Sequence, residues 1–348
     1  MNHAALSPGT AISGFMRLMT RRMEDHVVTR EMELVPYKLT KRQGWACIQV
    51  VTGPDGHVKE FSLVHLAGIL ISELRHKAEA HLGREVANAV IAVPQYLPYS
   101  GRQDLASVGR YDLGFHGFKV IDQQIAAAAA YHHHTKRGDG KAVLVFHVGG
   151  RTSSATIYKF INGTARHIAA RSDLFLGGDD FTARIVDYMA GLIRRRHQWN
   201  IRQDKEAQLR LRVACEHAKK ALSDQEETLV QVDGGGISLS AALTRAKLEE
   251  MNRDLFHRAL DLVDEVVMGS GRPRVESRKD MVDEVVLVGG SARIPTVRQF
   301  VKDYFHGRGP NSRKGVEAEE AVVRGTAILS RPEAARYVEE CFDHLYGG

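Results

Sequence analysis

The stretch from Lys141 to Tyr158, KAVLVFHVGGRTSSATIY, constrains the fold of this chain more than any other. An apolar run leads into the glycine pair Gly149-Gly150, and a second run with the composition of a strand follows. This order predicts a β-hairpin whose turn leaves backbone amides bare enough for a phosphate to approach closely. Paired glycines are also frequent in hairpin turns that bind nothing. The stretch therefore predicts a hairpin and leaves open whether its turn binds an anion.

Strands and helices alternate from residue 87 to residue 131, which predicts an α/β layer on a mostly parallel sheet. The helix predicted at residues 64–82 has Ile69, Leu70 and Leu74 at helical intervals and Gly83 as its C-terminal stop. The other predicted strands lie at residues 46–51, 58–61, 87–93, 118–121, 164–170, 228–232 and 284–288. The other predicted helices lie at residues 102–113, 125–131, 181–196, 204–223, 243–267 (with Ser240 as its cap), 317–330 and 332–345.

A second glycine pair, Gly289-Gly290, follows the strand predicted at residues 284–288. Both glycine pairs come at the carboxyl end of a predicted strand, and open α/β sheets bind their ligands at that edge. Neither pair matches the dinucleotide fingerprint or the Walker loop. A third pair, Gly177-Gly178, opens a predicted helix and suits either a cap or an anion site. The residues alone thus predict an α/β protein that holds a phosphate-bearing ligand between glycine turns.

Composition narrows the class of protein. A chain of 348 residues exceeds the ordinary size of one compact core, so two or more lobes are expected. The net charge is +6 and the pI about 9.2, but the basic residues form short separate clusters without interleaved aromatics, so no nucleic-acid partner is expected. The sequence has neither an apolar run of membrane-spanning length nor the features of a signal peptide. Cys47, Cys215 and Cys341 are widely spaced and fit a reducing compartment, so a cytoplasmic protein without a membrane partner is expected.

Four motifs give the chain a family resemblance. They are ANAVIAVPQY at residues 87–96, LGGDDF at 176–181, ACEHAKKALS at 214–223 and VLVGGSARIP at 286–295. With these motifs the chain resembles, from about residue 2 to residue 329, the nucleotide-binding domain of the 70-kDa heat-shock chaperones. The resemblance implies an α/β, actin-like ATPase fold with two lobes around a nucleotide cleft. It also implies ATP or ADP as the ligand.

The resemblance also implies which residues bind the nucleotide. Glu216, Lys219 and Ser223 would border the adenosine, and their spacing places them on one face of a helix. Without the resemblance, the spacing of Glu216 and Lys219 favours a simple surface ion pair. The other implied residues are Gly149, Gly150, Thr152 and Gly178 around the phosphates, Gly289, Gly290, Ser291 and Arg293 facing the adenosine helix, and Glu319 near the nucleotide.

The chain departs from the family where metal binding and catalysis take place. The family's phosphate hairpin reads D-L-G-G-G-T-x-D, whereas this chain has His147 and Ser154 in place of the acids and Arg151 in place of the third glycine. The family's catalytic lysine falls at Met16, and the acid of its N-E-P-T segment falls at Gln123. Arg151 and a protonated His147 are cations that can offset some of the phosphate charge, but neither substitutes for Mg²⁺ held by carboxylates. Phosphoryl transfer to water depends on Mg²⁺ and cations, so impaired hydrolysis is expected, Mg²⁺ binding is left open, and no catalytic residue or metal ligand is assigned.

The predicted domains follow the family pattern. Residues 1–137 form a first lobe that is incomplete at its N-terminus, because the family's first phosphate loop has no counterpart. Residues 138–331 form the second lobe with an outer subdomain at 177–255, and residues 332–348 form a C-terminal helix or tail. The family's peptide-binding domain also has no counterpart.

Three functions are compatible with this pattern. The first is a heat-shock-chaperone ATPase domain that binds ATP or ADP with impaired hydrolysis. The second is a non-catalytic pseudo-ATPase scaffold for co-chaperones, such as a nucleotide-exchange factor or a J-domain protein. The third is a truncated product with little function of its own, because a lost sheet edge leaves strands unpaired.

Overall fold

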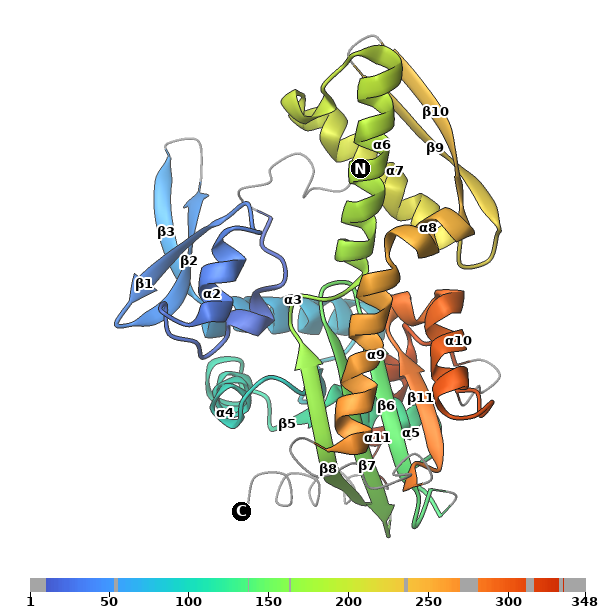
Figure 1. The fold of residues 1–348 in the computed structure, drawn as a ribbon. Helices are drawn as coiled ribbons and strands as arrows, with labels where there is room; N and C mark the ends of the chain where they lie inside the picture. The colour runs from blue at the N-terminus through green and yellow to red at the C-terminus, as the bar shows by residue number, and fades with distance from the viewer. Residues whose placement is uncertain are drawn as a thin grey trace. The chain divides into compact units, whose positions relative to one another are not determined.

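The computed structural model describes residues 11–52, 56–136, 138–162, 164–234, 237–269, 281–310, 316–331 and residue 334. Contacts divide the chain into two compact units, of which the first comprises residues 1–129 with 322–348 and the second residues 130–321. Both units mix helices with sheets, as the sequence predicts (Figure 1). The domain boundaries given above remain a prediction, and the helix predicted at 332–345 lies outside the described residues except for residue 334.

The first unit contains two sheets. Its strands are β1 (Lys38–Arg42), β2 (Trp45–Thr52) and β3 (His57–Ser62), which form an antiparallel sheet, and β4 (Asn88–Val93) and β5 (Gly117–Asp122), which pair in parallel. Its helices are η1 (Phe15–Leu18), α2 (His26–Met32), α3 (Leu63–Leu82), α4 (Tyr99–Ser107), the π-helical turn η2 (Val108–Asp112), α5 (Gln123–Ala130) and α11 (Ala321–Leu329). The predicted helix at 64–82 is confirmed as α3, with Gly83 at φ 65° as its C-cap.

A buried ion pair and a close helix contact mark the interior of the first unit. The Arg102 guanidinium lies 3.2 Å from the Asp122 carboxylate, and it also donates to the backbone carbonyl of Leu97. α5 and α11 meet at Gly325, where a Cβ would lie 1.6 Å from the Ala126 carbonyl oxygen. Only a residue without a side chain permits this approach. None of the helices in the described ranges combines the length and apolarity that crossing a bilayer requires.

The second unit is built on a four-stranded sheet with strand order β11-β6-β7-β8. Its strands are β6 (Ala142–Val148), β7 (Ser153–Ile161), β8 (Thr164–Asp173) and β11 (Glu284–Val288). The parallel pairing predicted for residues 87–131 is confirmed by β4 and β5 of the first unit. In the present sheet only β11 and β6 are parallel, while β6-β7 and β7-β8 are antiparallel. The antiparallel pairs follow from two short hairpin connections, which return the chain beside the strand it has just left.

Helix α9 (Arg253–Met268) covers one face of this sheet (Figure 1). Its Phe256, Val263 and Val267 are almost fully buried in one core with Phe146 of β6. The remaining elements of the second unit are α6 (Gly178–His197), η3 (Ile201–Gln203), α7 (Lys205–Ala221), β9 (Glu227–Gly234), β10 (Ile237–Thr244), α8 (Arg245–Met251), η5 (Gly290–Arg293) and α10 (Pro295–Tyr304).

The single helix predicted at residues 243–267 is wrong. Residues up to Thr244 belong to β10, in which buried Ala241 and Leu243 alternate with outward-facing neighbours and pair with β9. The cap is Thr244, whose hydroxyl accepts a hydrogen bond from the Lys247 amide at 3.2 Å, and Ser240 lies within the strand. Buried Asn252 separates α8 from α9. Helical propensity beyond 244 was a correct signal, but strand pairing decided where the helix begins.

Candidate functional site

The two predicted glycine turns lie at the same edge of the sheet in the second unit. The turn between β6 and β7 is closed by the Gly149 amide, which donates to the Thr152 carbonyl at 2.9 Å. Val288 at the end of β11 pairs with His147 at the end of β6, so Gly289 comes next to this turn. Gly289 has φ 94°, and a Cβ there would lie 2.4 Å from the Val148 carbonyl oxygen. The prediction that both turns follow the carboxyl ends of strands is confirmed.

The start of α6 packs directly on the first glycine turn. The amides of Gly178 and Asp179 donate to the carbonyls of Gly149 and Gly150 at 2.9 and 2.7 Å. The Gly177 amide donates to the Asp180 carboxylate at 2.8 Å, which caps the helix. These bonds favour the cap over the anion site for the Gly177-Gly178 pair, because they engage the amides that an anion would need.

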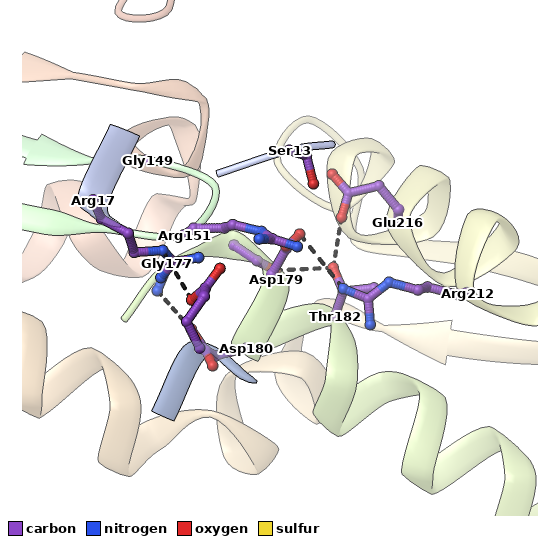
Figure 2. Close-up of polar contacts among 12 residues, drawn as sticks. Ser13, Arg17, Gly149, Arg151, Gly177, Asp179, Asp180, Thr182, Arg212 and Glu216 are labelled. Carbon is purple, nitrogen blue, oxygen red and sulfur yellow. Dashed lines mark hydrogen bonds and ion pairs between the residues drawn. The ribbon is translucent and has the colours of Figure 1, made fainter. Parts of the chain in front are cut away.

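α7 contributes a buried charge network. The Lys219 ammonium donates to the Gly178 carbonyl at 2.8 Å and to the Glu216 carboxylate at 2.7 Å. The Thr182 hydroxyl donates to the same carboxylate at 2.5 Å, and Lys220 lies 3.6 Å from its second oxygen (Figure 2 shows Thr182 and Glu216). Lys219 is only 5% exposed, so the interpretation of this pair as a surface ion pair is wrong.

The network holds Glu216 in its charged form. Burial alone raises the pKa of the Glu216 carboxyl, but the charge of Lys219, the hydrogen bonds from Lys219 and Thr182 and the charge of Lys220 outweigh it, so the pKa is lowered. Burial lowers the pKa of the Lys219 ammonium, and the Glu216 carboxylate opposes that effect. A carboxylate therefore faces the site from α7.

These elements enclose a cavity of about 600 Å³ within the second unit. Its walls come from the first glycine turn, the start of α6, the C-terminal half of α7, η5 and the segment before α11. The lining residues are Gly150, Asp179, Glu216, Lys219, Lys220, Ala221, Ser223, Asp224, Gly290, Ser291, Arg293, Ile294 and Glu319. The volume is that of a typical small-molecule site.

η5 forms the wall opposite α7. The Ser291 hydroxyl donates to the Gly149 carbonyl at 3.0 Å, which ties η5 to the glycine turn. The Arg293 guanidinium lies 3.2 Å from Glu319 and 3.7 Å from Asp224, and it is partly exposed. A cationic plane flanked by two carboxylates can stack on a planar ring and accept hydrogen bonds from hydroxyl or amino groups beside it.

Arg151 extends from the tip of the first glycine turn to the cavity rim. Its Nε lies 3.0 Å from the Asp179 carboxylate, whose other oxygen lies 3.6 Å from Arg212 of α7 (Figure 2). Asp179 itself lines the cavity. The substitution that the sequence places at the family's third glycine thus positions a guanidinium at this rim.

His147 is neutral at physiological pH. Burial lowers the pKa of its imidazole from the ordinary value of 6.5 to about 4. An imidazole with this pKa carries no proton at pH 7, so His147 does not supply the positive charge that could offset phosphate charge. Ser154, which replaces the second acid, is buried on β7. The turn between β6 and β7 then has one positive side chain, that of Arg151.

The lowered pKa of His147 predicts an acid-sensitive fold. Between pH 6.5 and 4 the unfolded chain binds a proton that the folded chain does not, so this contribution is complete above pH 6.5 and lost as the pH falls toward 4. At pH 4.5 we expect the wild type to lose about 2 kcal/mol more stability, relative to pH 7, than His147→Gln. Urea unfolding of both proteins at the two pH values measures the difference.

His81→Gln, at an exposed histidine, is the control for removing an imidazole. It should leave the pH dependence of the stability as it is in the wild type. A two-dimensional NMR titration assigns the imidazole directly. A pKa near 6.5 for His147 in the folded protein would contradict the expectation.

The remaining predicted residues fall into two groups. Gly149, Thr152, Gly178 and Gly289 do not line the cavity among the described residues, and they hold its walls together through their backbones. Met16 lies in η1 and Gln123 begins α5, so both belong to the first unit. Within the described residues, no group of three or more His, Cys, Asp and Glu side chains is arranged to hold a metal ion.

Several site residues were not predicted from the sequence. Thr182, Lys220 and Asp224 join the network or the cavity lining, and Asp179 faces the cavity although it was noted only as part of a motif. Helical spacing could have found two of them, because Lys220 follows Glu216 by one turn of α7 and Thr182 follows Gly178 by one turn of α6. Asp224 had no such signal, since it lies beyond the end of α7.

A smaller cavity, of about 310 Å³, lies within the first unit. Arg21, Arg42, Asp104 and Trp45 are among its lining residues. Arg21 is bonded to Asp25 at 2.8 Å. Among its described lining residues, none belongs to the glycine turns or motifs singled out in the sequence.

Comparisons with known proteins identify the family of the chain. The family model described as Hsp70 protein matches residues 1–334. The heat shock 70 kDa protein BIP3 of Oryza sativa subsp. japonica is 37% identical over 347 residues, covering 94% of this chain and 48% of the relative. A heat shock 70 kDa protein of Neurospora crassa is 34% identical over 329 residues, covering 94% of this chain and 49% of the relative. The chain thus spans about half the length of the curated relatives it matches, and it belongs to the Hsp70 family.

Proposed function

We propose that the second unit binds ATP or ADP in the cavity between α7 and η5. The observation that carries the proposal is this cavity of about 600 Å³, which is lined by Glu216 and Lys219 of α7, by Ser223 just beyond its end and by Arg293 of η5. Membership of the Hsp70 family supports it, since that family implies the actin-like ATPase fold. The fit is supported further by Gly150, where a Cβ would meet no atom within 4 Å, so the turn is open on that side.

The lining residues supply the interactions that an adenosine group requires. Arg293 offers a planar cation for stacking on the base. Glu216 and Glu319 offer carboxylate acceptors for the ribose hydroxyls and the exocyclic amino group, and Ser223 offers a hydroxyl. The Lys219 ammonium already bonds Glu216 and Gly178, so its role is to hold the carboxylate and the start of α6 in place. Binding through these groups needs no metal.

We propose further that hydrolysis is impaired. Family-like hydrolysis relies on Mg²⁺ to neutralise and position the phosphates. The described residues do not fit such an ion, because neutral His147 and buried Ser154 stand where the family has its two acids. Neither of these two residues gives the hairpin a carboxylate that could bind the ion. Nucleotide binding without family-like turnover is the expected behaviour.

The proposed domains rest on the family pattern, and the proposed location rests on the cysteine usage of the sequence. We propose the two lobes at 1–137 and 138–331, the outer subdomain at 177–255 and a cytoplasmic location. A non-catalytic scaffold for co-chaperones, such as a nucleotide-exchange factor or a J-domain protein, is the second candidate function. The replacement of both hairpin acids favours it over an active ATPase.

The binding proposal predicts a large effect of Arg293. In Arg293→Ala the adenosine site loses its stacking cation, so we expect affinity for adenosine and for ADP to fall about tenfold each. Isothermal titration calorimetry of the full chain measures both affinities. Arg298→Ala is the matched control, because Arg298 is an exposed arginine on the neighbouring α10 and does not line the cavity.

The two parts of the proposal fail separately. If wild-type protein binds neither adenosine nor ADP, or if Arg298→Ala weakens binding as much as Arg293→Ala, the proposed site is wrong. If the protein binds ADP and also releases phosphate from ATP over repeated turnovers with Mg²⁺, the site stands and the proposed impairment is wrong. Phosphate release at a fixed ATP concentration measures the second point.

A further inference from the structure

The first glycine turn presents a cation to the cavity rim. Gly150 lines the cavity, and Arg151 follows it in the turn. The Arg151 Nε lies 3.0 Å from Asp179 Oδ2, and Asp179 lines the same cavity. The guanidinium therefore lies beside a carboxylate that any ligand reaching this end of the cavity would meet.

The contact between Arg151 and Asp179 can be exchanged. Both side chains are partly exposed, at 31% and 41%, and Arg212 is within 3.6 Å of the second Asp179 oxygen. Ion pairs at such exposure contribute little to stability. A phosphate group is a better partner for the guanidinium, because it carries more charge and accepts two parallel hydrogen bonds. Asp179 would keep Arg212 as a partner when Arg151 turns to the phosphate.

The charge of the turn makes a metal unnecessary. In the family pattern two acids flank the turn, and they need a divalent cation before phosphates can approach. Here the acids are replaced by His147 and Ser154, and Arg151 supplies a positive charge directly. Burial keeps the pKa of His147 at about 4, so that side chain adds no charge at pH 7. The side chains of the turn are then positive without any bound ion.

We propose that Arg151 is a phosphate-specificity residue: its guanidinium exchanges the contact with Asp179 for one with the terminal phosphate of a nucleoside diphosphate. Nucleotide binding is then independent of divalent metal. This inference rests on the proposed adenosine site. It assigns to Arg151 the difference in affinity between ADP and adenosine. It also assigns to Asp179 the role of a competitor that holds Arg151 when no phosphate is present.

Calorimetry of the full chain with adenosine and with ADP tests the inference. In wild-type protein we expect ADP to bind at least tenfold more tightly than adenosine, with the same affinity in EDTA as in Mg²⁺. Raising the salt concentration should weaken ADP binding and leave adenosine binding unchanged, because only the phosphate contact is ionic. An ADP affinity that rises more than tenfold with Mg²⁺ would overturn metal independence.

Substitutions separate Arg151 from the rest of the site. Arg151→Ala should lower ADP affinity about tenfold and leave adenosine affinity unchanged. Arg151→Lys should lower ADP affinity less than Arg151→Ala does, because lysine keeps the positive charge but not the two parallel hydrogen bonds. Asp179→Asn should raise ADP affinity severalfold, because it removes the competing carboxylate. Arg184→Ala, at a partly exposed arginine of α6 paired with Asp254, is the control and should change neither affinity.

A reconstructed hairpin provides the reciprocal test. Arg151→Gly combined with His147→Asp removes the cation and restores an acid, so its ADP affinity should be low in EDTA and rise with Mg²⁺. If Arg151→Ala or Arg151→Gly binds ADP as tightly as the wild type or more tightly, Arg151 obstructs or ignores the phosphate and the inference is wrong. If adenosine itself does not bind wild-type protein, the failure belongs to the proposed site instead.

Discussion

Replacing Gly325 with alanine is expected to destabilise the first unit by about 3 kcal/mol or more. A Cβ on Gly325 would lie 1.6 Å from the Ala126 carbonyl oxygen, an atom of the α5 backbone that cannot rotate away. The two helices must therefore separate, which opens the contact of α11 with the alanines of α5. Among those alanines, Ala126 to Ala130 are at most 2% exposed, so their burial depends on close neighbours.

The same substitution in another helix gives the control. Gly191 lies inside α6, and a Cβ there would lie 3.4 Å from the end of the flexible Arg195 side chain. Because alanine favours the helix and restricts the unfolded chain, Gly191→Ala is expected to stabilise the second unit by about 0.5–1 kcal/mol. The same glycine-to-alanine substitution should thus lower the stability at one helical position and raise it at the other.

Tryptophan fluorescence can report each unit separately. The chain has two tryptophans, Trp45 in the first unit and Trp199 in the second. In a Trp199→Phe background, urea unfolding of Gly325→Ala follows the first unit through Trp45, and a Trp45→Phe background follows Gly191→Ala through Trp199. A loss of less than about 1 kcal/mol for Gly325→Ala would show that α11 does not pack on α5 as closely as described.

Removing the Lys219 ammonium is expected to cost about 3 kcal/mol in the second unit. In Lys219→Ala the Glu216 carboxylate stays partly buried without its closest cation, and the Gly178 carbonyl loses a donor at 2.8 Å. Leaving one member of a buried pair uncompensated is more costly than removing both. The double variant Glu216→Gln with Lys219→Met should therefore be more stable than Lys219→Ala.

Lys220→Ala is the matched control for Lys219→Ala. Lys220 lies 3.6 Å from the same carboxylate but is 71% exposed, so its loss is expected to cost less than about 1 kcal/mol. Urea unfolding followed at Trp199 compares the variants. Equal losses at the two lysines would mean that burial does not distinguish them and that the network around Glu216 is not as described.

Local sequence patterns predicted several helices and strands, but the bounds of others depend on contacts with elements distant in the sequence. α3 was predicted with its stop at Gly83, because periodicity and a glycine are properties of the local chain. Burial on that helix was not predictable, since Ile69, Leu70 and Leu74 remain about half exposed. β10 was missed although residues 237–244, ISLSAALT, alternate as a strand does; pairing with β9 extends the strand to Thr244, which caps α8.

The candidate site divides in the same way. The spacing predicts Glu216, Lys219 and Ser223 on one helix face, but α7 ends at Ala221, before Ser223. Spacing alone also favours a surface pair for Glu216 and Lys219, and only packing against the start of α6 buries Lys219. The replacements at His147 and Arg151 are visible in the sequence. Their consequences are not, because burial determines the pKa of the imidazole and the approach of α6 brings Asp179 to the guanidinium.

The sequence by itself determined the family, the two glycine turns at strand ends and the loss of both hairpin acids. These depend on residue identity and on spacing along the chain. The tertiary structure decided that the turns meet at one sheet edge, that Lys219 is a buried partner of Glu216, and that Arg151 rather than His147 is the cation at the first glycine turn. The physical reason is that charge state and contact depend on desolvation and on neighbours distant in sequence, which local patterns do not contain.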